Sequence, residues 1–244
     1  MLNGELKIGV IGVGNLGSSL AQLLSRNGYT MTLVDPDPSK LVRFETNYDL
    51  RNYQIFDVAF VCVKPAQTQE VLSNLNSKII VSTVASVDLS KLKLWNNSKN
   101  IVRCMPNLPI STGSGSIVWY GKSSQVIKNQ LNNILRGPAS VWVNQEDRID
   151  LATALLGSGP AYFSCIYNHL AEIGQDIPDI DILLKGMIEG SLKLDQTNLI
   201  KEVATKGGVT ESILESLETN GLKNIMRDGI NSGLNKINTL KKNQ

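Results

Sequence analysis

The feature that most constrains the fold is a glycine-rich turn near the amino terminus, KIGVIGVGNLG at residues 7–17. The apolar run from Ile8 to Ile11 predicts a buried parallel strand, and the pattern from Ser18 to Ser25 predicts a helix. Three glycines separate the two elements: Gly12, Gly14 and Gly17. In such a unit the first glycine allows a tight turn, the second lets the backbone approach a pyrophosphate, and the third lets helix and strand pack closely. The turn therefore predicts a nucleotide site at the start of the helix.

A glycine triplet alone also fits an ordinary strand-to-helix turn, so the residues that follow it matter. A second strand is predicted from Thr30 to Val34, and it ends at Asp35. An acid at this spacing commonly binds the ribose hydroxyls of a dinucleotide, although Asp35 could also be a turn former in the sequence DPDP. Together, residues 7–35 predict a dinucleotide-binding βαβ unit.

Composition narrows the classes of function. The 244 residues carry a formal net charge of +2, and 19% are charged, which is ordinary for a soluble surface. Because no long basic block appears, we expect no binding to nucleic acid, and we interpret residues 236–242 as a solvated helix end. The apolar runs are too short for a membrane span and no signal sequence is evident, so we expect a cytoplasmic protein that does not bind a membrane.

The cysteines give no sign of a metal centre. Cys62, Cys104 and Cys165 lie in apolar runs without a CxxC pair, and the chain has one histidine, His169. We therefore predict reduced thiols in the core and no metal site. We interpret His169 as a helix or interface residue rather than a proton donor.

Strand and helix patterns alternate through the first part of the chain. After residue 35, strands are predicted at 57–63, 78–83, 101–104, 115–120 and 140–144, and helices at 38–50 (with a loop), 66–75 and 123–135. This alternation predicts an α/β fold with a Rossmann-type, doubly wound parallel sheet over residues 1–145. Ligands of such sheets lie beyond the carboxyl ends of the strands, where residues 64–65, 83–86 and 105–107 fall.

From residue 146 to 244 no further strand pattern appears. Helices are predicted at 147–157, 160–173, 179–194, 199–204, 210–218 and 221–240. The last carries an apolar stripe at helical spacing: Leu222, Ile225, Met226, Ile230, Leu234 and Ile237. Since an all-helical part of this size has little core of its own, we expect it to pair with a second copy in a homodimer.

Two glycine turns in the helical part suggest sites for an anion. LGSGPAY at 156–162 places Pro160 where a helix could begin with free N–H groups beside Ser158. TKGGVT at 205–210 places two glycines before a helix that Thr210 could cap. Helix starts of this kind bind carboxylates, although either stretch could be only a turn between helices.

Five motifs together resemble those of pyrroline-5-carboxylate reductases, in order and approximate spacing over nearly the whole chain. They are Gly12-x-Gly14-Asn15-Leu16-Gly17, Val63-Lys64-Pro65, Met105-Pro106-Asn107-x-Pro109, Gly157-Ser158-Gly159-Pro160-Ala161-Tyr162 and Gly207-Gly208-Val209-Thr210. The resemblance implies reduction of 1-pyrroline-5-carboxylate to L-proline with NAD(P)H, the last step of proline biosynthesis. It also implies a Rossmann domain followed by a helical domain that interleaves with its mate, in dimers that often assemble further.

The resemblance also assigns residues to sites. Cofactor binding falls to Gly12, Val13, Gly14, Asn15, Leu16, Gly17, Asp35, Val63, Lys64, Pro65, Met105 and Asn107, with Lys64, Pro65 and Asn107 near the nicotinamide. Substrate binding across the dimer interface falls to Thr205, Gly207, Gly208, Val209 and Thr210, with Ser158 and Asn107. Thr210 and Thr205 are the expected catalytic residues, and Thr210 is expected to touch the ring nitrogen.

Some residues depart from the family pattern. Asp35-Pro36-Asp37 replaces a common Asn-Arg pair, and since two carboxylates would repel a 2′-phosphate, we predict a preference for NADH. Asn168 replaces a usual glutamate, Lys206 a frequent proline, the Gln-Thr pair is absent near residues 185–188, and the loop before residue 205 is shorter.

These departures leave two alternatives open. One is a reductase of a different small imino or keto acid. The other is a catalytically silent NAD(P)(H)-binding regulatory relative, against which the retained Thr205 and Thr210 argue, since a sensor has no need of a site for a substrate carboxylate.

Overall fold

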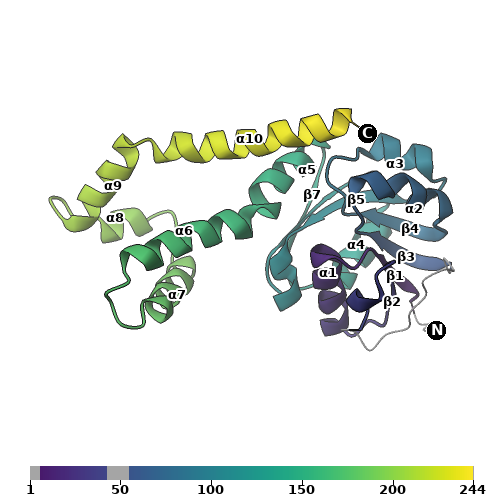
Figure 1. Cartoon of the computed structure of the whole chain (residues 1–244), viewed down its shortest axis with the longest axis horizontal. Coiled ribbons are helices and arrows are strands. Elements are labelled where there is room, and N and C mark those ends of the chain that lie inside the picture. The colour runs from purple at the N-terminus through teal and green to yellow at the C-terminus, as the bar shows by residue number, and fades with distance from the viewer. Residues whose placement is uncertain (1–5, 43–54, 244) are drawn as a thin grey trace. The chain divides into compact units, whose positions relative to one another are not determined.

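A seven-stranded sheet forms the larger part of the protein (Figure 1). The computed structural model describes residues 6–42 and 55–243. The strands are β1 (Ile8–Ile11), β2 (Thr32–Val34), β3 (Phe56–Val61), β4 (Ser77–Ser82), β5 (Ile101–Pro106), β6 (Ser116–Tyr120) and β7 (Ala139–Val143), in the order β2-β1-β3-β4-β5-β6-β7. All seven were predicted, with ends that differ by a few residues.

The sheet is parallel from β2 to β5, and its last two strands run the other way. β6 pairs antiparallel with β5, and β7 pairs parallel with β6. The predicted doubly wound parallel sheet is confirmed, with one antiparallel pair, β5 with β6, that was not predicted. The cause is the short connection between β5 and β6, which holds only the 3₁₀ turn η3 (Leu108–Thr112) and is too short for a parallel crossover.

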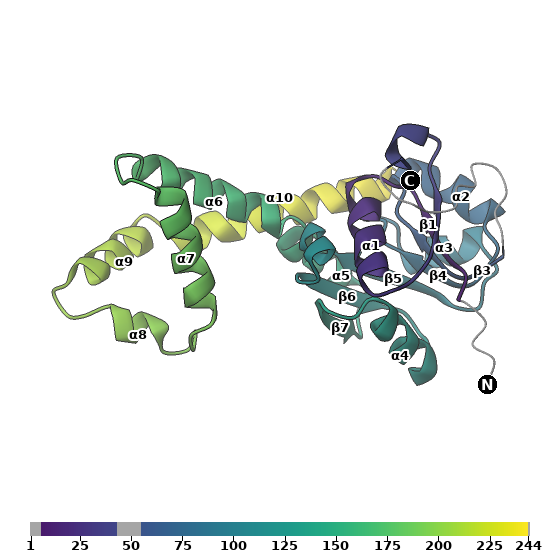
Figure 2. The ribbon, with the colours of Figure 1, turned by 90° about the horizontal axis from the view of Figure 1, so that it is seen from below.

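Helices cover both faces of the sheet, which confirms the doubly wound fold. α1 (Asn15–Arg26) and α4 (Gln125–Ile134) pack on one face, seen in Figure 2, and α2 (Thr68–Asn74) and α3 (Leu89–Trp95) on the other. Short 3₁₀ turns, η1 (Pro38–Lys40) and η2 (Pro65–Gln67), follow β2 and β3. The predicted segment 38–50 lies mostly outside the described residues. α3 was not predicted, because its seven residues carry two lysines and a weak apolar pattern.

The rest of the chain is helical, as predicted. Its elements are α5 (Asp147–Ala152), the π-helical turn η4 (Thr153–Gly157), α6 (Gly159–Ile173), α7 (Ile180–Leu192), α8 (Leu199–Val203), α9 (Val209–Thr219) and α10 (Leu222–Lys242). The chain forms two compact units, one of residues 1–160 with 233–244 and one of residues 161–232. We call them the sheet unit and the helical unit. The sheet unit thus extends past the predicted boundary at residue 145.

The helical unit has no core of its own. Every residue from 161 to 232 is described, and none of them is buried. Large apolar side chains are exposed on all its helices, among them Phe163, Ile173, Ile182, Met187, Ile213 and Ile225. One helical stretch, Asp147–Ile173, is long and apolar enough to cross a membrane by length and composition alone. Apolar exposure on this scale marks a surface that another molecule covers.

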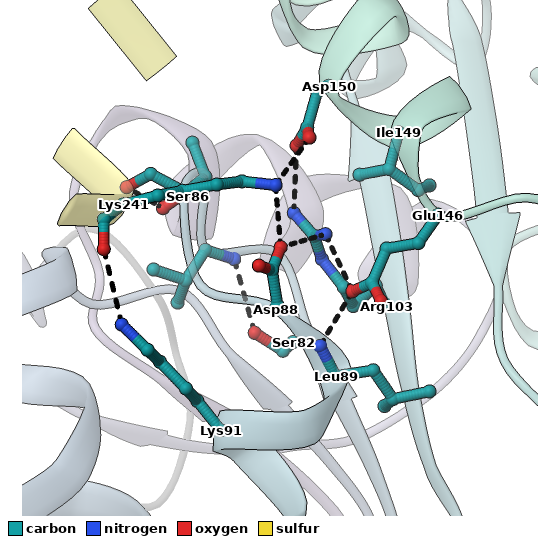
Figure 3. A network of polar contacts seen from close by, with 12 residues as sticks. Ser82, Ser86, Asp88, Leu89, Lys91, Arg103, Glu146, Ile149, Asp150 and Lys241 are labelled. Atoms are coloured by element: carbon teal, nitrogen blue, oxygen red, sulfur yellow. Dashed lines mark hydrogen bonds and ion pairs between the residues drawn. The ribbon is translucent and has the colours of Figure 1, made fainter. Parts of the chain in front are cut away.

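A network of charged side chains ties both ends of the helical segments to the sheet unit (Figure 3). Arg103 on β5 is 1% exposed, and its guanidinium lies 2.8 Å from Glu146 and 3.4 Å from Asp150. Lys241, near the end of α10, lies 2.5 Å from Asp150 and 2.6 Å from Asp88. Glu146 also accepts a hydrogen bond from the Leu89 N–H at the start of α3. The network therefore joins β5, α3, α5 and α10 at one place.

The charged side chains of this network are buried to different extents, and their contributions to folding stability therefore differ. Burial lowers the pKa of Lys241, but its contacts with Asp150 and Asp88 outweigh burial, and the pKa is raised. A raised lysine pKa means that its contribution to stability is present at neutral pH and is lost as the pH rises through the folded-state value. Arg103 is the least exposed member of the network.

We predict that Arg103→Met lowers the free energy of unfolding by about 3 kcal/mol, because it removes a fully buried cation from the buried Asp150 and the half-buried Glu146. Lys241→Met should cost only about 1 kcal/mol, since that pair is more exposed. Urea unfolding at a fixed protein concentration measures both, with Lys93→Met on the exposed side of α3 as the matched control. Equal stability of Arg103→Met and the control would contradict this.

Candidate active site

A cavity of about 520 Å³ lies at the point where the strand order reverses, beyond the carboxyl ends of β1 and β3. β2 lies on one side of β1 and β3 on the other, so the loops after these strands diverge and leave a crevice. Its lining includes Gly12, Gly14, Asp35, Lys40, Val63 and Lys64. Five of these six were predicted to bind the cofactor.

The three glycines of the turn are needed for different reasons. Gly12 has φ of +92°, which favours glycine, and its N–H bonds the Val34 carbonyl at 2.8 Å. A Cβ on Gly17 would lie 1.9 Å from the Gly12 carbonyl oxygen, so α1 can approach the strand only without a side chain there. A Cβ on Gly14 would meet nothing within 4 Å. Packing therefore explains Gly12 and Gly17, whereas Gly14 leaves open space at the start of α1.

The start of α1 is suited to an anion. The Ser18 N–H, bonded to the Gly14 carbonyl, closes the first turn of the helix, and no side chain caps the helix at Gly14. Asn15 is exposed, and the first turn of α1 carries no acidic residue. N–H groups at such a helix start favour a phosphate.

Asp35 is 4% exposed and holds the glycine turn from behind. One carboxylate oxygen accepts the Val13 N–H at 2.8 Å, and the other accepts the Asp37 N–H at 3.0 Å and the Lys40 ammonium at 3.1 Å. Three of about four acceptor positions of the carboxylate are thus taken. Sequence analysis missed Lys40, although a cation five residues after the acid was visible.

Asp37 is a second carboxylate close to Asp35 in the sequence, and it precedes the turn η1. It is exposed, and the Ser39 hydroxyl and N–H both donate to it, at 2.7 and 3.0 Å. These two bonds hold the pKa of Asp37 below its usual value, so the group is ionised at neutral pH.

The ends of β3 and β5 carry other predicted residues, of which Lys64 lines the cavity and Met105 and Asn107 do not. Lys64 and Pro65 begin η2, and Lys64 lines the cavity with its side chain exposed. Met105 and Pro106 belong to β5, which extends two residues beyond its predicted end. Met105 is buried and packs with Val118 and Ile149. The side chain of Asn107 bonds Ser116 and the Leu156 carbonyl.

The LGSGPAY stretch differs from its prediction. Residues 147–173 run as a helix in which 153–157 form a π turn, and the Ser158 N–H bonds the Thr153 carbonyl at 3.1 Å. α6 begins at Gly159, one residue before its predicted start at Pro160, but the Ser158 N–H before it is not free, because its i to i+5 bond to the Thr153 carbonyl occupies it.

The TKGGVT stretch does open a helix. Gly208, rather than Thr210, is the residue before α9, and Thr210 lies in its first turn, so the predicted cap is wrong. Gly207 has φ of +72°, and its N–H bonds a carboxylate oxygen of Glu211 at 2.6 Å. A Cβ on Gly208 would lie 2.6 Å from the Thr205 hydroxyl oxygen. The turn therefore already bonds one carboxylate, that of Glu211, and a side chain at position 208 would clash with Thr205.

The prediction for the cysteines is confirmed in part. Burial raises the pKa of Cys62 to about 12, and burial also raises the pKa of Cys104 well above its usual value. Cys165 is exposed on α6, 3.6 Å from His169, so the prediction of a core thiol is wrong there. Among the residues that the structure describes, no group of three or more potential metal ligands occurs.

Each of the two parts of the chain matches a family model of known proteins. Residues 146–240 match the family model described as pyrroline-5-carboxylate reductase dimerisation, and residues 7–86 match that described as NADP oxidoreductase, coenzyme F420-dependent. A pyrroline-5-carboxylate reductase of Aquifex aeolicus is 30% identical, over 93% of this chain and 94% of that relative. This chain belongs to the pyrroline-5-carboxylate reductase family.

Solved structures of the family agree over the whole length. That of a pyrroline-5-carboxylate reductase from Coxiella burnetii has a TM-score of 0.85 at 25% identity, covering 97% of this chain and 99% of that one. The Plasmodium falciparum pyrroline carboxylate reductase, solved with NADP bound, has a TM-score of 0.84 at 25% identity and covers 97% and 100%. A nicotinamide cofactor thus fits the family, and the cavity beside Gly14 has the chemistry for it.

We predict that Gly14→Ala and Gly17→Ala separate binding from folding. Gly14→Ala should leave the unfolding midpoint unchanged and weaken NADH binding about tenfold or more, because the new methyl enters only ligand space. Gly17→Ala should weaken binding and also cost about 1–3 kcal/mol of stability through overpacking. Urea unfolding and NADH fluorescence titration measure these effects. Destabilisation by Gly14→Ala equal to that by Gly17→Ala would contradict the assignment.

Proposed function

We propose that this protein reduces 1-pyrroline-5-carboxylate to L-proline with NAD(P)H, as the last step of proline biosynthesis in the cytoplasm. The observation that carries the proposal is similarity to the family over both units, since many dehydrogenases share the glycine turn but not the helical part. We further propose that residues 146–244 serve both substrate binding and dimerisation.

The substrate needs little chemical activation. A cyclic imine is readily protonated, and its protonated form is a strong electrophile, so the protein acts mainly by orientation. A bound nicotinamide nucleotide supplies the hydride. Residues 12–17 and Asp35 would hold its phosphates and ribose, with one acceptor position of Asp35 left for a hydroxyl. Val63, Lys64, Pro65, Met105 and the backbone of Asn107 would border the nicotinamide.

The substrate would be held at the TKGGVT turn. The Gly207 N–H bonds the Glu211 carboxylate in the structure. That contact supports the proposal that this N–H also binds the carboxylate of the substrate. Thr205, Gly208 and Val209 would shape this site, and the Thr210 hydroxyl would bond the ring nitrogen. Ser158 would contribute a further hydroxyl. No group with an unusual pKa is required, and His169, exposed on α6, takes no part.

We also propose a homodimer, which could assemble further. A second copy would cover the apolar side chains of the helical unit, none of which is buried in a single chain. This also supplies a reason, other than a membrane, for the apolar character of residues 147–173.

A different small imino or keto acid is the second candidate substrate. The residues that favour it are Asn168, which replaces the family's usual glutamate, and Lys206 beside the carboxylate turn. A panel of cyclic imines and 2-keto acids separates the two candidates by their kcat/KM.

Loss of NADH absorbance with synthetic pyrroline-5-carboxylate, together with formation of L-proline, tests the proposal. Thr210→Ala should lower kcat about 10- to 100-fold with an unchanged unfolding midpoint, because it removes the hydrogen bond to the ring nitrogen. Thr219→Ala, at the exposed end of the same helix, is the matched control. NADH binding without turnover on any substrate would instead indicate a regulatory relative, and unchanged kinetics of Thr210→Ala would remove this residue from the mechanism.

We propose a preference for NADH over NADPH, with kcat/KM about tenfold higher. Asp35 and Asp37 would place two negative charges near a 2′-phosphate, and the ammonium of Lys40 neutralises only that of Asp35. Asp37→Asn keeps the oxygen that Ser39 bonds but removes the charge, so it should shift the ratio several-fold towards NADPH. Asp147→Asn, at the exposed start of α5, is the control. Equal kcat/KM for the two cofactors in the wild type would contradict the preference.

A further inference from the structure

Asn107 physically connects two motifs that lie about fifty residues apart in the sequence. It ends the MPN motif after β5, and its side-chain amide nitrogen lies 3.1 Å from the Ser116 hydroxyl and 3.4 Å from the Leu156 carbonyl oxygen. Leu156 belongs to the π turn of the GSGPAY motif. We propose that the Asn107 side chain is a positioning residue that holds this π turn, rather than a ligand of cofactor or substrate.

The orientation of the amide follows from its other partner. The Asn107 side-chain oxygen accepts the Ser116 backbone N–H at 3.0 Å, and a backbone N–H can only donate. The amide nitrogen must therefore point the other way, toward Leu156. Both amide hydrogens of Asn107 are therefore engaged, one with Ser116 and one with Leu156, so the side chain has no hydrogen left to donate to a ligand.

The chain needs a donor at this place because of Pro160. In an α-helix the Leu156 carbonyl would accept the N–H of residue 160, and proline has none. A bend at Ser158 separates the π turn from α6, so Pro160 lies in the first turn of α6, where proline is tolerated, but the Leu156 carbonyl before it still lacks an N–H from residue 160. The Asn107 amide donates to the Leu156 carbonyl the hydrogen bond that Pro160 cannot donate. The bond from the Ser158 N–H to the Thr153 carbonyl closes a turn that is one residue longer than an α-helical turn.

This bridge fixes where the turn lies in the sheet unit. Gly157 lies against Met105 on β5, since a Cβ on it would be 3.8 Å from the Met105 sulfur. Ser158 is the next residue and is exposed. If Ser158 contacts the substrate, which rests on the proposed function, then Asn107 sets the position of that hydroxyl from the end of β5.

Asn107→Asp tests the bridge, because it keeps the oxygen that Ser116 bonds and replaces the donor with an oxygen that faces the Leu156 carbonyl. Hydrogen exchange at the Gly157 and Ser158 amides should speed up about tenfold, and this readout needs no substrate. The KM for the imine should rise about tenfold while the KM for NADH stays within about twofold. Ser116→Ala, which leaves the bond to Leu156 in place, is the control and should change neither.

Pro160→Ala provides the decisive second variant, since alanine restores a backbone N–H for the Leu156 carbonyl. In the double variant Asn107→Asp with Pro160→Ala, exchange and KM should return to within about threefold of Pro160→Ala alone. If Asn107→Asp does not fold, recovery of folded protein in the double variant supports the same conclusion.

A raised KM for NADH without rescue would make Asn107 a cofactor ligand and overturn the proposal. Unchanged hydrogen exchange in Asn107→Asp would also overturn it. If exchange changes and is rescued but no imine is reduced, the proposed function fails and the bridge stands.

Discussion

The constraint on which the account depends is that residues 161–232 cannot bury their own apolar side chains. Four helices and part of α10 leave Phe163, Ile182, Met187 and Ile213 exposed, and no residue in this range is buried. A unit of this kind gains too little from burial to offset the entropy of ordering its chain. Because the TKGGVT turn lies in this unit, the proposed substrate site exists only where a second molecule stabilises the helices.

The sheet unit, by contrast, is held by contacts that leave little freedom. The Gly12 carbonyl blocks any side chain at Gly17, and Asp35 fastens the same turn through the Val13 N–H. At the other side of the sheet, Arg103 binds the chain where it leaves the sheet at Glu146, and the same network holds Lys241 where the chain returns. The cavity beside Gly14 and the charged network thus both lie in the sheet unit.

Sequence patterns predicted the strands and the glycine turn well, because these depend on local chemistry. Ile8 to Ile11 is apolar without interruption, and the glycines follow at the spacing that a nucleotide turn requires. What failed depends on contacts between distant residues. Gly157 and Pro160 resemble a simple break between helices, whereas the structure has a π turn and a bend there, beside a contact from Asn107 that lies about fifty residues away in the sequence. The spacing of Lys40 from Asp35 was visible, but only the structure shows that the two side chains form an ion pair. The antiparallel β6 follows from the shortness of one loop.

Sedimentation equilibrium of the unmodified chain at micromolar concentration tests the central claim most directly. The account predicts a mass of twice the 26.6 kDa of one chain, or a whole multiple of that dimer, together with loss of helical circular dichroism when the assembly dissociates on dilution. A monomer that keeps its full helical content and reduces pyrroline-5-carboxylate would contradict it, because the helices would then be stable without a second copy.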